Sequence, residues 1–239
     1  MRIITWNCNM AFRKKAAVIL KYKPDILIVP ECEHPDKLQF ADDVTKPNDM
    51  VWIGENRNKG LGIFSYSDLR FKLHKTHNPE LKLIAPVKIF NDKTNIMLFA
   101  IWANNPADKD GPYVTQVWKA LQHYSRIIRT TNTILTGDFN SNTIWDRPRR
   151  EGNHSTVVQR LGKKKIYSTY HKHFLQEQGK EMHPTYYLYK HQQKPYHLDY
   201  CFASGDLINK LRSVEVGNYE EWIKYSDHVP VIVHFNDIR

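Results

Sequence analysis

Asp138 and Asn140 are the two residues whose types and spacing best suit catalysis. They follow the apolar residues Ile134 and Leu135, at a point where strand-forming residues give way to Gly, Asp and Asn. In an extended chain, side chains two positions apart point to the same side. The carboxylate can take a proton or orient a water while the amide donates hydrogen bonds to an oxyanion. A turn rich in Asp and Asn that merely closes a strand is the alternative.

Four further strand-like segments carry an amide, a carboxylate or an imidazole at one end. They are IITWNCN (3–9), DILIVPE (25–31), HLDYCF (197–202) and YSDHVPVIV (225–233). Together with GDFN (137–140), this ordered set resembles the endonuclease/exonuclease/phosphatase superfamily of Mg²⁺-dependent phosphodiesterases, which includes exonuclease III, apurinic/apyrimidinic endonucleases and DNase I. The resemblance extends from residue 3 to residue 235.

This resemblance implies a fold of the α/β class, a four-layer α/β/β/α sandwich. Two mostly antiparallel or mixed sheets would pack face to face with helices outside, in a single domain spanning residues 1–239. The pattern agrees, because it predicts roughly ten short strands and two long amphipathic helices, at 11–23 and 113–128. One of two interpretations of the basic segment described below adds a shorter helix at 155–161.

The resemblance also implies a role for each strand-end residue. Asp138 would orient or deprotonate the attacking water, Asn140 would bind the non-bridging phosphate oxygens, and His228 would contact the scissile phosphate. Asp199 would orient His228 and raise its pKa. The implied catalytic residues are therefore Asp138, Asn140, His228 and Asp199.

A metal site is implied at Glu31, Asn7 and Asp227. From the residues alone, Glu31 is either a surface carboxylate or a ligand, and the resemblance makes it the main ligand for Mg²⁺, for which Mn²⁺ can substitute. Mg²⁺ prefers oxygen ligands and keeps several waters, so few protein ligands suffice. Glu33, two residues further on, is expected to be solvated.

Trp102 departs from the family pattern, since the nearest families carry Tyr or His there. An indole has one N–H donor and cannot transfer a proton at neutral pH, so Trp102 can only donate a hydrogen bond to phosphate or stack on a base or sugar. The substrate-binding residues implied by the resemblance are Asn7, Trp102, Asn105 and Asn140.

Basic residues are concentrated in the segment 145–195, which has eleven Lys or Arg against four Asp or Glu. Interleaved aromatic residues and the run Lys163, Lys164 and Lys165 suit a nucleic-acid groove, so these lysines are predicted to bind substrate. The equally weighted alternative is a helix with a solvated basic end. His171 and His173 lack a third ligand at metal spacing and are expected on the surface.

The composition limits the class of protein. A net charge of +10 over 239 residues favours a polyanionic partner, which we expect to be nucleic acid and specifically DNA. No apolar segment approaches the length of a membrane span, and the three cysteines fit small buried residues in a reducing compartment. We therefore expect a cytoplasmic protein with no membrane association and no protein partner.

Three functions remain open at this stage. The first is a Mg²⁺-dependent nuclease acting on DNA. The second is a phosphodiesterase or phosphatase acting on a small or lipid substrate, because a fold does not fix the substrate. The third is a nucleic-acid-binding protein that has lost catalysis, which the presence of Trp102 makes worth testing.

Overall fold

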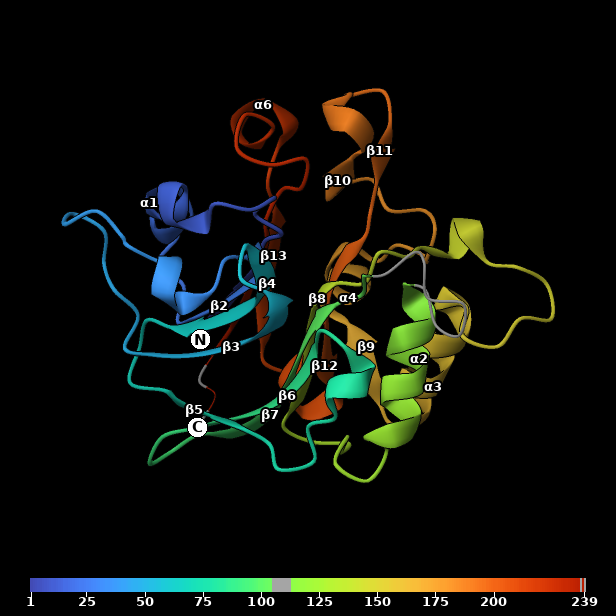
Figure 1. Ribbon diagram of the computed structural model, residues 1–239. Coiled ribbons are helices and arrows are strands. Elements are labelled where there is room, and N and C mark those ends of the chain that lie inside the picture. The colour runs from blue at the N-terminus through green and yellow to red at the C-terminus, as the bar shows by residue number, and fades with distance from the viewer. Residues whose placement is uncertain (105–112, 237, 239) are drawn as a thin grey trace.

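Two six-stranded mixed sheets packed face to face form the centre of the computed structural model, which describes residues 1–104, 113–236 and 238 (Figure 1). The first sheet has, in spatial order, β13 (Leu211–Val216), β14 (Val231–Phe235), β1 (Arg2–Thr5), β2 (Ile26–Cys32), β4 (Lys59–Ser65) and β3 (Asp49–Asn56). The second has β5 (Arg70–Leu73), β6 (Ile84–Phe90), β7 (Asn95–Trp102), β8 (Thr133–Asp138), β12 (Asp199–Ser204) and β9 (Ile166–Ser168). The β1–β2 and β7–β8 pairs are parallel and the other pairs are antiparallel.

Helices cover the outer faces of the two sheets. In Figure 1, α2 (Val114–His123) and α3 (His154–Lys163) lie on one side, and α1 (Ala16–Leu20) lies on the other. The remaining α-helices are α4 (Thr169–Phe174), α5 (Gly205–Ile208) and α6 (Tyr219–Trp222). The 3₁₀ turns are η1 (Phe12–Lys14), η2 (Pro35–Lys37), η3 (Pro79–Leu81), η4 (Thr143–Trp145) and η5 (Leu188–Lys190), and a two-stranded ribbon joins β10 (Tyr186–Tyr187) to β11 (Pro195–Tyr196). The predicted α/β sandwich is confirmed.

The strand sequences explain this layering. In β2, Ile26 and Ile28 face the core between the two sheets, while Leu27 and Val29 face the core beneath α1 and α6. A strand that is buried on both faces needs an uninterrupted apolar sequence, which β2 has. Each outer sheet face thus has a hydrophobic layer of its own in addition to the shared one.

Both predicted long helices are shorter in the structure. The segment 11–23 divides into η1 and α1, because Ala11 has a left-handed φ of 51° and Lys15 has a φ of −121°. The segment 113–128 contains α2, which begins after Tyr113 (φ 48°) and ends at His123. The apolar stripe therefore indicated the buried face correctly but not the helix length. The described residues contain fourteen strands, more than the sequence indicated.

Gly137 allows β7 and β8 to approach closely just before Asp138. Its φ is 142°, and a Cβ atom there would lie 1.8 Å from the carbonyl oxygen of Ile101. Only glycine fits such a position. The approach places Asp138 directly beside Trp102 in the parallel register.

Two further expectations from the sequence concern the cysteines and the possibility of membrane-spanning helices. Cys8, Cys32 and Cys201 are all buried and free, as their sequence contexts predicted. Within the described residues, every helix is too short or too polar to cross a bilayer.

Candidate active site

Residues from five separate parts of the chain meet at one edge of the sandwich. Asn7 follows β1, Glu31 lies near the end of β2, and Asp138 ends β8. Asp199 begins β12 and pairs directly with Asp138 across the two strands. His228 lies just before β14, completing a cluster that the sequence motifs predicted.

His228 is hydrogen-bonded to Asp199 and lies close to Asp138. Its Nδ1 is 2.8 Å from Asp199 Oδ2, and its Nε2 is 3.9 Å from Asp138 Oδ2. The backbone on both sides is fixed, because the Trp6 indole donates to the His228 carbonyl oxygen and the Ser226 hydroxyl accepts from the His228 N–H. Nδ1 bonded to a carboxylate leaves Nε2 facing Asp138 and the edge of the site.

Burial and neighbouring charge shift the ionisation of this cluster in a way that suits proton transfer. Burial alone would lower the pKa of His228, but the negative charges of Asp199 and Asp138 raise it to about 10. Burial, with the negative charge of Asp199 adding to it, raises the pKa of Asp138 to about 7. A cationic imidazole thus lies beside a carboxyl group that exchanges its proton near neutral pH, and such a pKa suits a general base.

Asparagine side chains fix the orientation of Asp138. The Asn7 amide donates to Asp138 Oδ2 over 3.1 Å, and the Asn140 amide donates to the same oxygen over 3.0 Å. Asn140 also donates its backbone N–H to Asp138 Oδ1 and its amide to the carbonyl oxygen of Ala103. In this structure Asn140 therefore orients Asp138, and it has no amide hydrogen left over for a phosphate oxygen unless one of these bonds breaks.

Glu31 lies at a bulge whose backbone presents the carboxylate at the edge of the sheet. Its φ is 62°, and the β2–β4 register shifts between Pro30 and Cys32. A left-handed non-glycine residue at a strand end is a recurring feature of functional sites. The Asn7 amide lies 3.4 Å from Glu31 Oε1, so one amide contacts the carboxylates of both Glu31 and Asp138.

These donors fit a hard divalent cation. Glu31 and Asp227 are both partly exposed carboxylates, and Asp227 accepts a hydrogen bond from the Asn9 amide over 3.1 Å. Oxygen donors open to water are the set that Mg²⁺ uses. Asn7 faces Glu31 with its nitrogen, and its oxygen accepts from the Asn9 N–H, so Asn7 orients the carboxylate in this structure.

Asp138, Asp199 and His228 also have ligand atoms within 4.8 Å of one another, the separation expected of a metal-binding group. The hydrogen bond between His228 and Asp199 occupies two of these ligands, and a cation there would have to displace it. Among the described residues, Asp199 Oδ1 is buried and has no hydrogen-bond partner. A cation on the Glu31 side of Asp138 would leave the hydrogen bond between His228 and Asp199 in place.

Glu33 is buried, so the prediction that it is solvated was wrong. Its carboxylate accepts hydrogen bonds from the backbone N–H groups of Phe12 and Arg13 and pairs with the Arg13 guanidinium at 2.8 Å. A buried carboxylate needs such partners. Glu33 therefore holds the loop after β1 in place instead of facing solvent.

Trp102 lies beside Asp138 but belongs to the core between the sheets. Only 3% of its surface is exposed, and the Lys59 ammonium lies 5.9 Å from the centroid of its ring. It lines a cavity next to the catalytic cluster. Asn105, the other predicted contact on this loop, lies outside the described residues.

The structure does not bring Lys163, Lys164 and Lys165 to this cluster. The strand β12 runs from Asp199 to Ser204, which pairs with Ile166, so the lysines lie about 16 Å from Asp199 at the opposite end of the sheet. The Lys164 ammonium donates to the carbonyl oxygens of Ser125 and Ile128, just beyond the end of α2. This placement favours the alternative of a solvated basic helix end.

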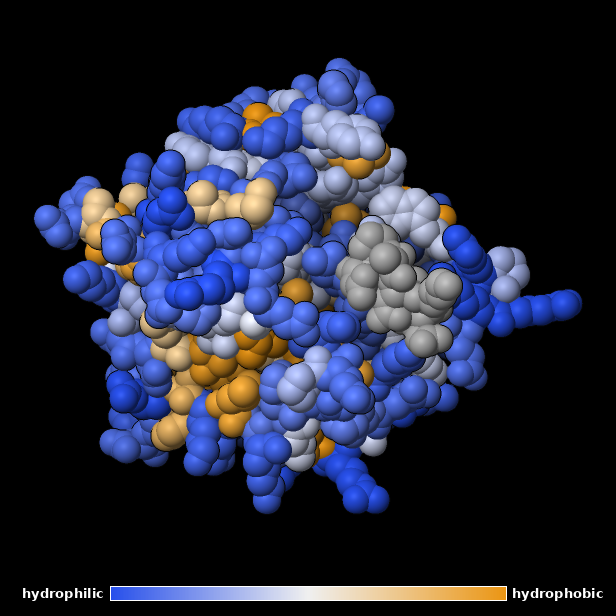
Figure 2. Space-filling model, in the orientation of Figure 1, coloured by the Kyte–Doolittle hydropathy of each residue, from blue (hydrophilic) through white to orange (hydrophobic). Residues whose placement is uncertain are grey.

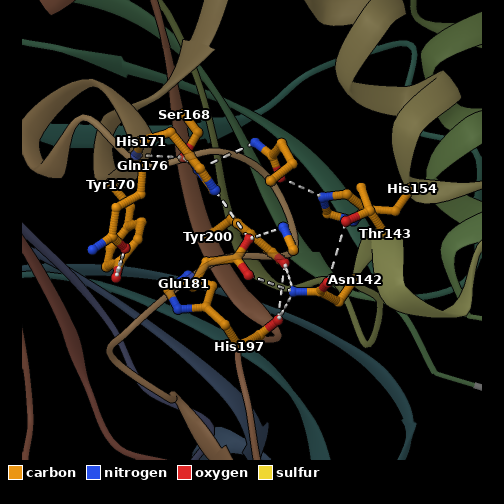
Figure 3. Close-up of polar contacts among 12 residues, drawn as sticks. Asn142, Thr143, His154, Ser168, Tyr170, His171, Gln176, Glu181, His197 and Tyr200 are labelled. Carbon is orange, nitrogen blue, oxygen red and sulfur yellow. Dashed lines mark hydrogen bonds and ion pairs between the residues drawn. The ribbon is translucent and has the colours of Figure 1, made fainter.

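Polar side chains from the segment after Asn140 and from later parts of the chain form a continuous series of hydrogen bonds (Figure 3). His154 contacts the Ser141 hydroxyl and the Gln178 carbonyl oxygen, and the Gln178 amide donates to His171. His171 Nε2 lies 3.0 Å from one oxygen of Glu181, and Asn142 donates to the other oxygen over the same distance. The hydrogen-bonded residues follow one another in the order Ser141, His154, Gln178, His171, Glu181 and Asn142.

The hydrogen-bonded chain connects the loop after Asn140 to the loop before β10. Burial lowers the pKa of His154 to about 4, so this imidazole is neutral and can accept on one nitrogen while it donates on the other. The prediction that His171 is a surface residue was wrong, because its side chain is only 10% exposed. No periodic pattern in the sequence predicts this hydrogen-bonded chain, because its residues come from four separate segments.

Sequence reasoning also missed Tyr186 as part of the site. Its backbone bridges to His228, and its ring lies 4.6 Å from the imidazole. Tyr196 lies beside it at 6.4 Å, and Trp145 lies beside Tyr196 at 4.9 Å. These rings line a cavity of about 660 Å³ together with Arg147 and other residues. The aromatic richness of 145–195 was a signal, but it did not indicate which rings face the site.

The comparison with protein families identifies the class. Residues 4–228 match the model of the Endonuclease/Exonuclease/phosphatase family. The chain belongs to this family, whose members include phosphoester hydrolases and nucleases. A search of curated protein sequences found no match.

Solved structures with the same fold agree with this assignment. A 3′-5′ exonuclease from Neisseria meningitidis is 20% identical, with a TM-score of 0.68 over 99% of this chain and 100% of the other. A Neisseria 3′ phosphatase bound to a product DNA hairpin is 21% identical, with a TM-score of 0.69 over 99% of both chains. An AP endonuclease from Archaeoglobus fulgidus is 16% identical, with a TM-score of 0.66 over 99% of this chain and 100% of that one. At these identities the likeness establishes the fold.

Proposed function

We propose that this protein is a Mg²⁺-dependent phosphodiesterase that hydrolyses nucleic acid, with DNA as the substrate. The observation that carries the proposal is the cluster of Asp138, Asp199 and His228, buried beside the partly exposed carboxylate of Glu31. It combines a base, a cation and a metal ligand at one edge of the sandwich. Membership in the Endonuclease/Exonuclease/phosphatase family supports the same chemistry.

Each residue has a role that follows from its contacts. Asp138 accepts a proton from the attacking water, because its pKa of about 7 allows it to exchange protons near neutral pH. The Asn7 and Asn140 amides hold its Oδ2, and the Asn140 backbone N–H holds its Oδ1. The cationic ring of His228, oriented by Asp199, interacts with the negative charge that builds up on the phosphoryl oxygens.

The metal would be held by Glu31 and Asp227, with Asn7 orienting the Glu31 carboxylate. When bound, Mg²⁺ supplies positive charge that stabilises the phosphoryl group and the leaving oxygen. The protein's own contribution there is to keep two carboxylates at a water-accessible edge, one on each side of the Asn7 and Asn9 loop.

A nucleic-acid substrate is supported by the surface around His228. The cavity of about 660 Å³ has aromatic rings from Tyr186, Tyr196 and Trp145 and guanidinium groups from Arg147 and Arg150. Rings that stack on bases, next to cations that neutralise phosphates, are typical of nucleic-acid grooves. The net charge of +10 favours the same partner.

A panel of substrates tests this proposal. The protein is incubated with an abasic-site duplex, a single-stranded oligodeoxynucleotide, RNA and p-nitrophenyl phosphate, in Mg²⁺ or in EDTA. A Glu31→Gln variant and the matched surface variant Glu80→Gln are run in parallel. We expect DNA cleavage in Mg²⁺ only, with Glu31→Gln strongly impaired and Glu80→Gln unaffected.

Two results would contradict the proposal. Cleavage of the phosphomonoester alone would identify a phosphatase of small substrates. DNA binding that persists in EDTA, with no turnover of any substrate in Mg²⁺ or Mn²⁺, would identify a binding protein.

A further inference from the structure

A second cavity adjoins the catalytic cluster on the side opposite Tyr186. It has a volume of about 390 Å³ and lies between the β3–β4 hairpin, the η3 turn and the end of β7. Trp102 ends β7 and is in register with Asp138 on β8. Gly60, at the start of β4, pairs with Cys32, the residue that follows Glu31. The cavity is thus one strand away from the cluster in both sheets, and adjacent strands are about 4.8 Å apart.

The lining of this cavity combines apolar residues with charged ones, which include Glu55 and two lysines. Ile53, Leu83 and Trp102 form apolar walls, and Lys59 and Lys82 are also among the lining residues. Lys59 lies over the indole of Trp102. Figure 2 shows a hydrophobic area, bordered by polar residues, over the region where β3, β6 and β7 lie in Figure 1. An exposed apolar hollow with polar margins commonly marks a ligand site.

His77 adds a polar group to the same cavity. It is one of the lining residues, and its Nε2 is buried without a hydrogen-bond partner in the part of the chain that the structure describes. Burial lowers the pKa of His77, so the ring is neutral and can either donate or accept. Unpaired buried polar atoms are rare in native proteins and often have a partner in a ligand or water.

We propose that this cavity binds a nucleobase of the substrate, next to the nucleotide whose phosphate lies at Asp138. The inference rests on the proposed function and deepens it. A flat heterocycle fits between the apolar walls of the cavity and can hydrogen-bond to the neutral ring of His77, and Lys59 and Lys82 complement the attached phosphates. The position one strand from Asp138 is within reach of an adjoining nucleotide.

This site would select unpaired nucleotides. A base inside a duplex is stacked on its neighbours, and it can enter a cavity only after it unstacks. The protein would therefore act preferentially on single strands or frayed ends.

The test compares two small probes, deoxyadenosine 5′-monophosphate and 2-deoxyribose 5-phosphate, which differ only by the base. Binding is measured by calorimetry in Ca²⁺ with the wild type, with Leu83→Trp, which fills the cavity, and with Lys59→Ala. Lys88→Ala is the matched control, because Lys88 lies over the Phe90 ring in a similar contact, outside the cavity.

We expect the wild type to bind the nucleotide about 10- to 100-fold more tightly than the sugar phosphate, the range for burying one apolar group of side-chain size. Leu83→Trp should abolish this difference and Lys59→Ala should reduce it, while Lys88→Ala should retain it. The inference is overturned if the wild type binds both probes equally, or if Leu83→Trp and Lys59→Ala both keep the full difference.

A second readout separates this inference from the proposed function. In Mg²⁺, the ratio of cleavage rates on a single-stranded oligonucleotide and on the blunt duplex of the same sequence should fall in Leu83→Trp. An unchanged ratio with active enzyme would refute the cavity's role and leave the phosphodiesterase intact. Absence of cleavage by the wild type would refute the phosphodiesterase, whereas the nucleotide-binding difference would still report on the cavity.

Discussion

Replacing Glu181 with Gln should destabilise the protein strongly at neutral pH and only weakly in acid. The Glu181 side chain is 4% exposed and accepts hydrogen bonds from His171, Asn142 and the Gly179 N–H. Burial alone would raise the pKa of Glu181, but these hydrogen bonds lower it to about 2. The folded state therefore binds the charged form more tightly than the unfolded state does.

The size and direction of the effect follow from this pKa. The ordinary value for this group is 4.5, so the charged carboxylate contributes about 3 kcal/mol to the free energy of unfolding at pH 7. Because the folded pKa is depressed, the contribution is present above pH 4.5 and is lost as the pH falls towards 2. At pH 3 about 1 kcal/mol remains. For a chain of this length, 3 kcal/mol corresponds to a fall in Tm of about 6–12 °C.

Thermal unfolding followed by circular dichroism between pH 3 and pH 7 measures this dependence. Glu177→Gln is the matched control, because Glu177 is an exposed glutamate in the same loop and should show no change in Tm at any pH. A Glu181→Gln variant with the wild-type Tm at pH 7, or with a deficit that grows in acid, would refute the reasoning.

Three further predictions concern the site. Glu31→Gln should weaken Mg²⁺ binding by calorimetry at least about tenfold without changing Tm, because it removes a ligand charge at a partly exposed position; unchanged affinity would place the metal elsewhere. His228→Ala should lower kcat about 100- to 1,000-fold with little change in KM, since the imidazolium acts on charge that develops during the reaction; an equal rise in KM would instead indicate a binding role. Reversing Lys163 and Lys165 to Glu should leave kcat/KM for a short oligonucleotide within about twofold at physiological salt, because they are more than a Debye length from Asp199; a large loss would restore the predicted basic groove.

The residues that form the catalytic cluster were predictable because their sequence context is local. Asp138 and Asn140 follow a strand in one short motif, and the register of β8 with β12 then places Asp199 opposite Asp138. Alternation and apolar runs predict strands, and polar residues at strand ends converge once those strands share an edge. The α/β sandwich and the cluster from Asn7 to His228 were expected from the family resemblance that these motifs carry, and the local patterns agreed with it.

The errors concern residues whose environment depends on contacts distant in sequence. Glu33 and His171 are charged or polar residues in unremarkable contexts, and nothing near them in the sequence indicates the buried partners Phe12 and Glu181. The helix predicted at 11–23 was too long for a related reason, because Ala11, which has a left-handed φ, belongs to the loop that carries Asn9. Composition showed that 145–195 is basic and aromatic, but not that Lys164 points to the end of α2.

The most direct test of the central claim is single-turnover cleavage of a labelled oligonucleotide by the wild type and by Asp138→Asn, in Mg²⁺ and in EDTA. The exposed Asp92→Asn variant is the matched control, and circular dichroism confirms that all three proteins are folded. We predict cleavage by the wild type and Asp92→Asn in Mg²⁺ only, with Asp138→Asn slower by at least about 1,000-fold. Cleavage by Asp138→Asn within tenfold of the wild-type rate, or wild-type cleavage in EDTA, would contradict it.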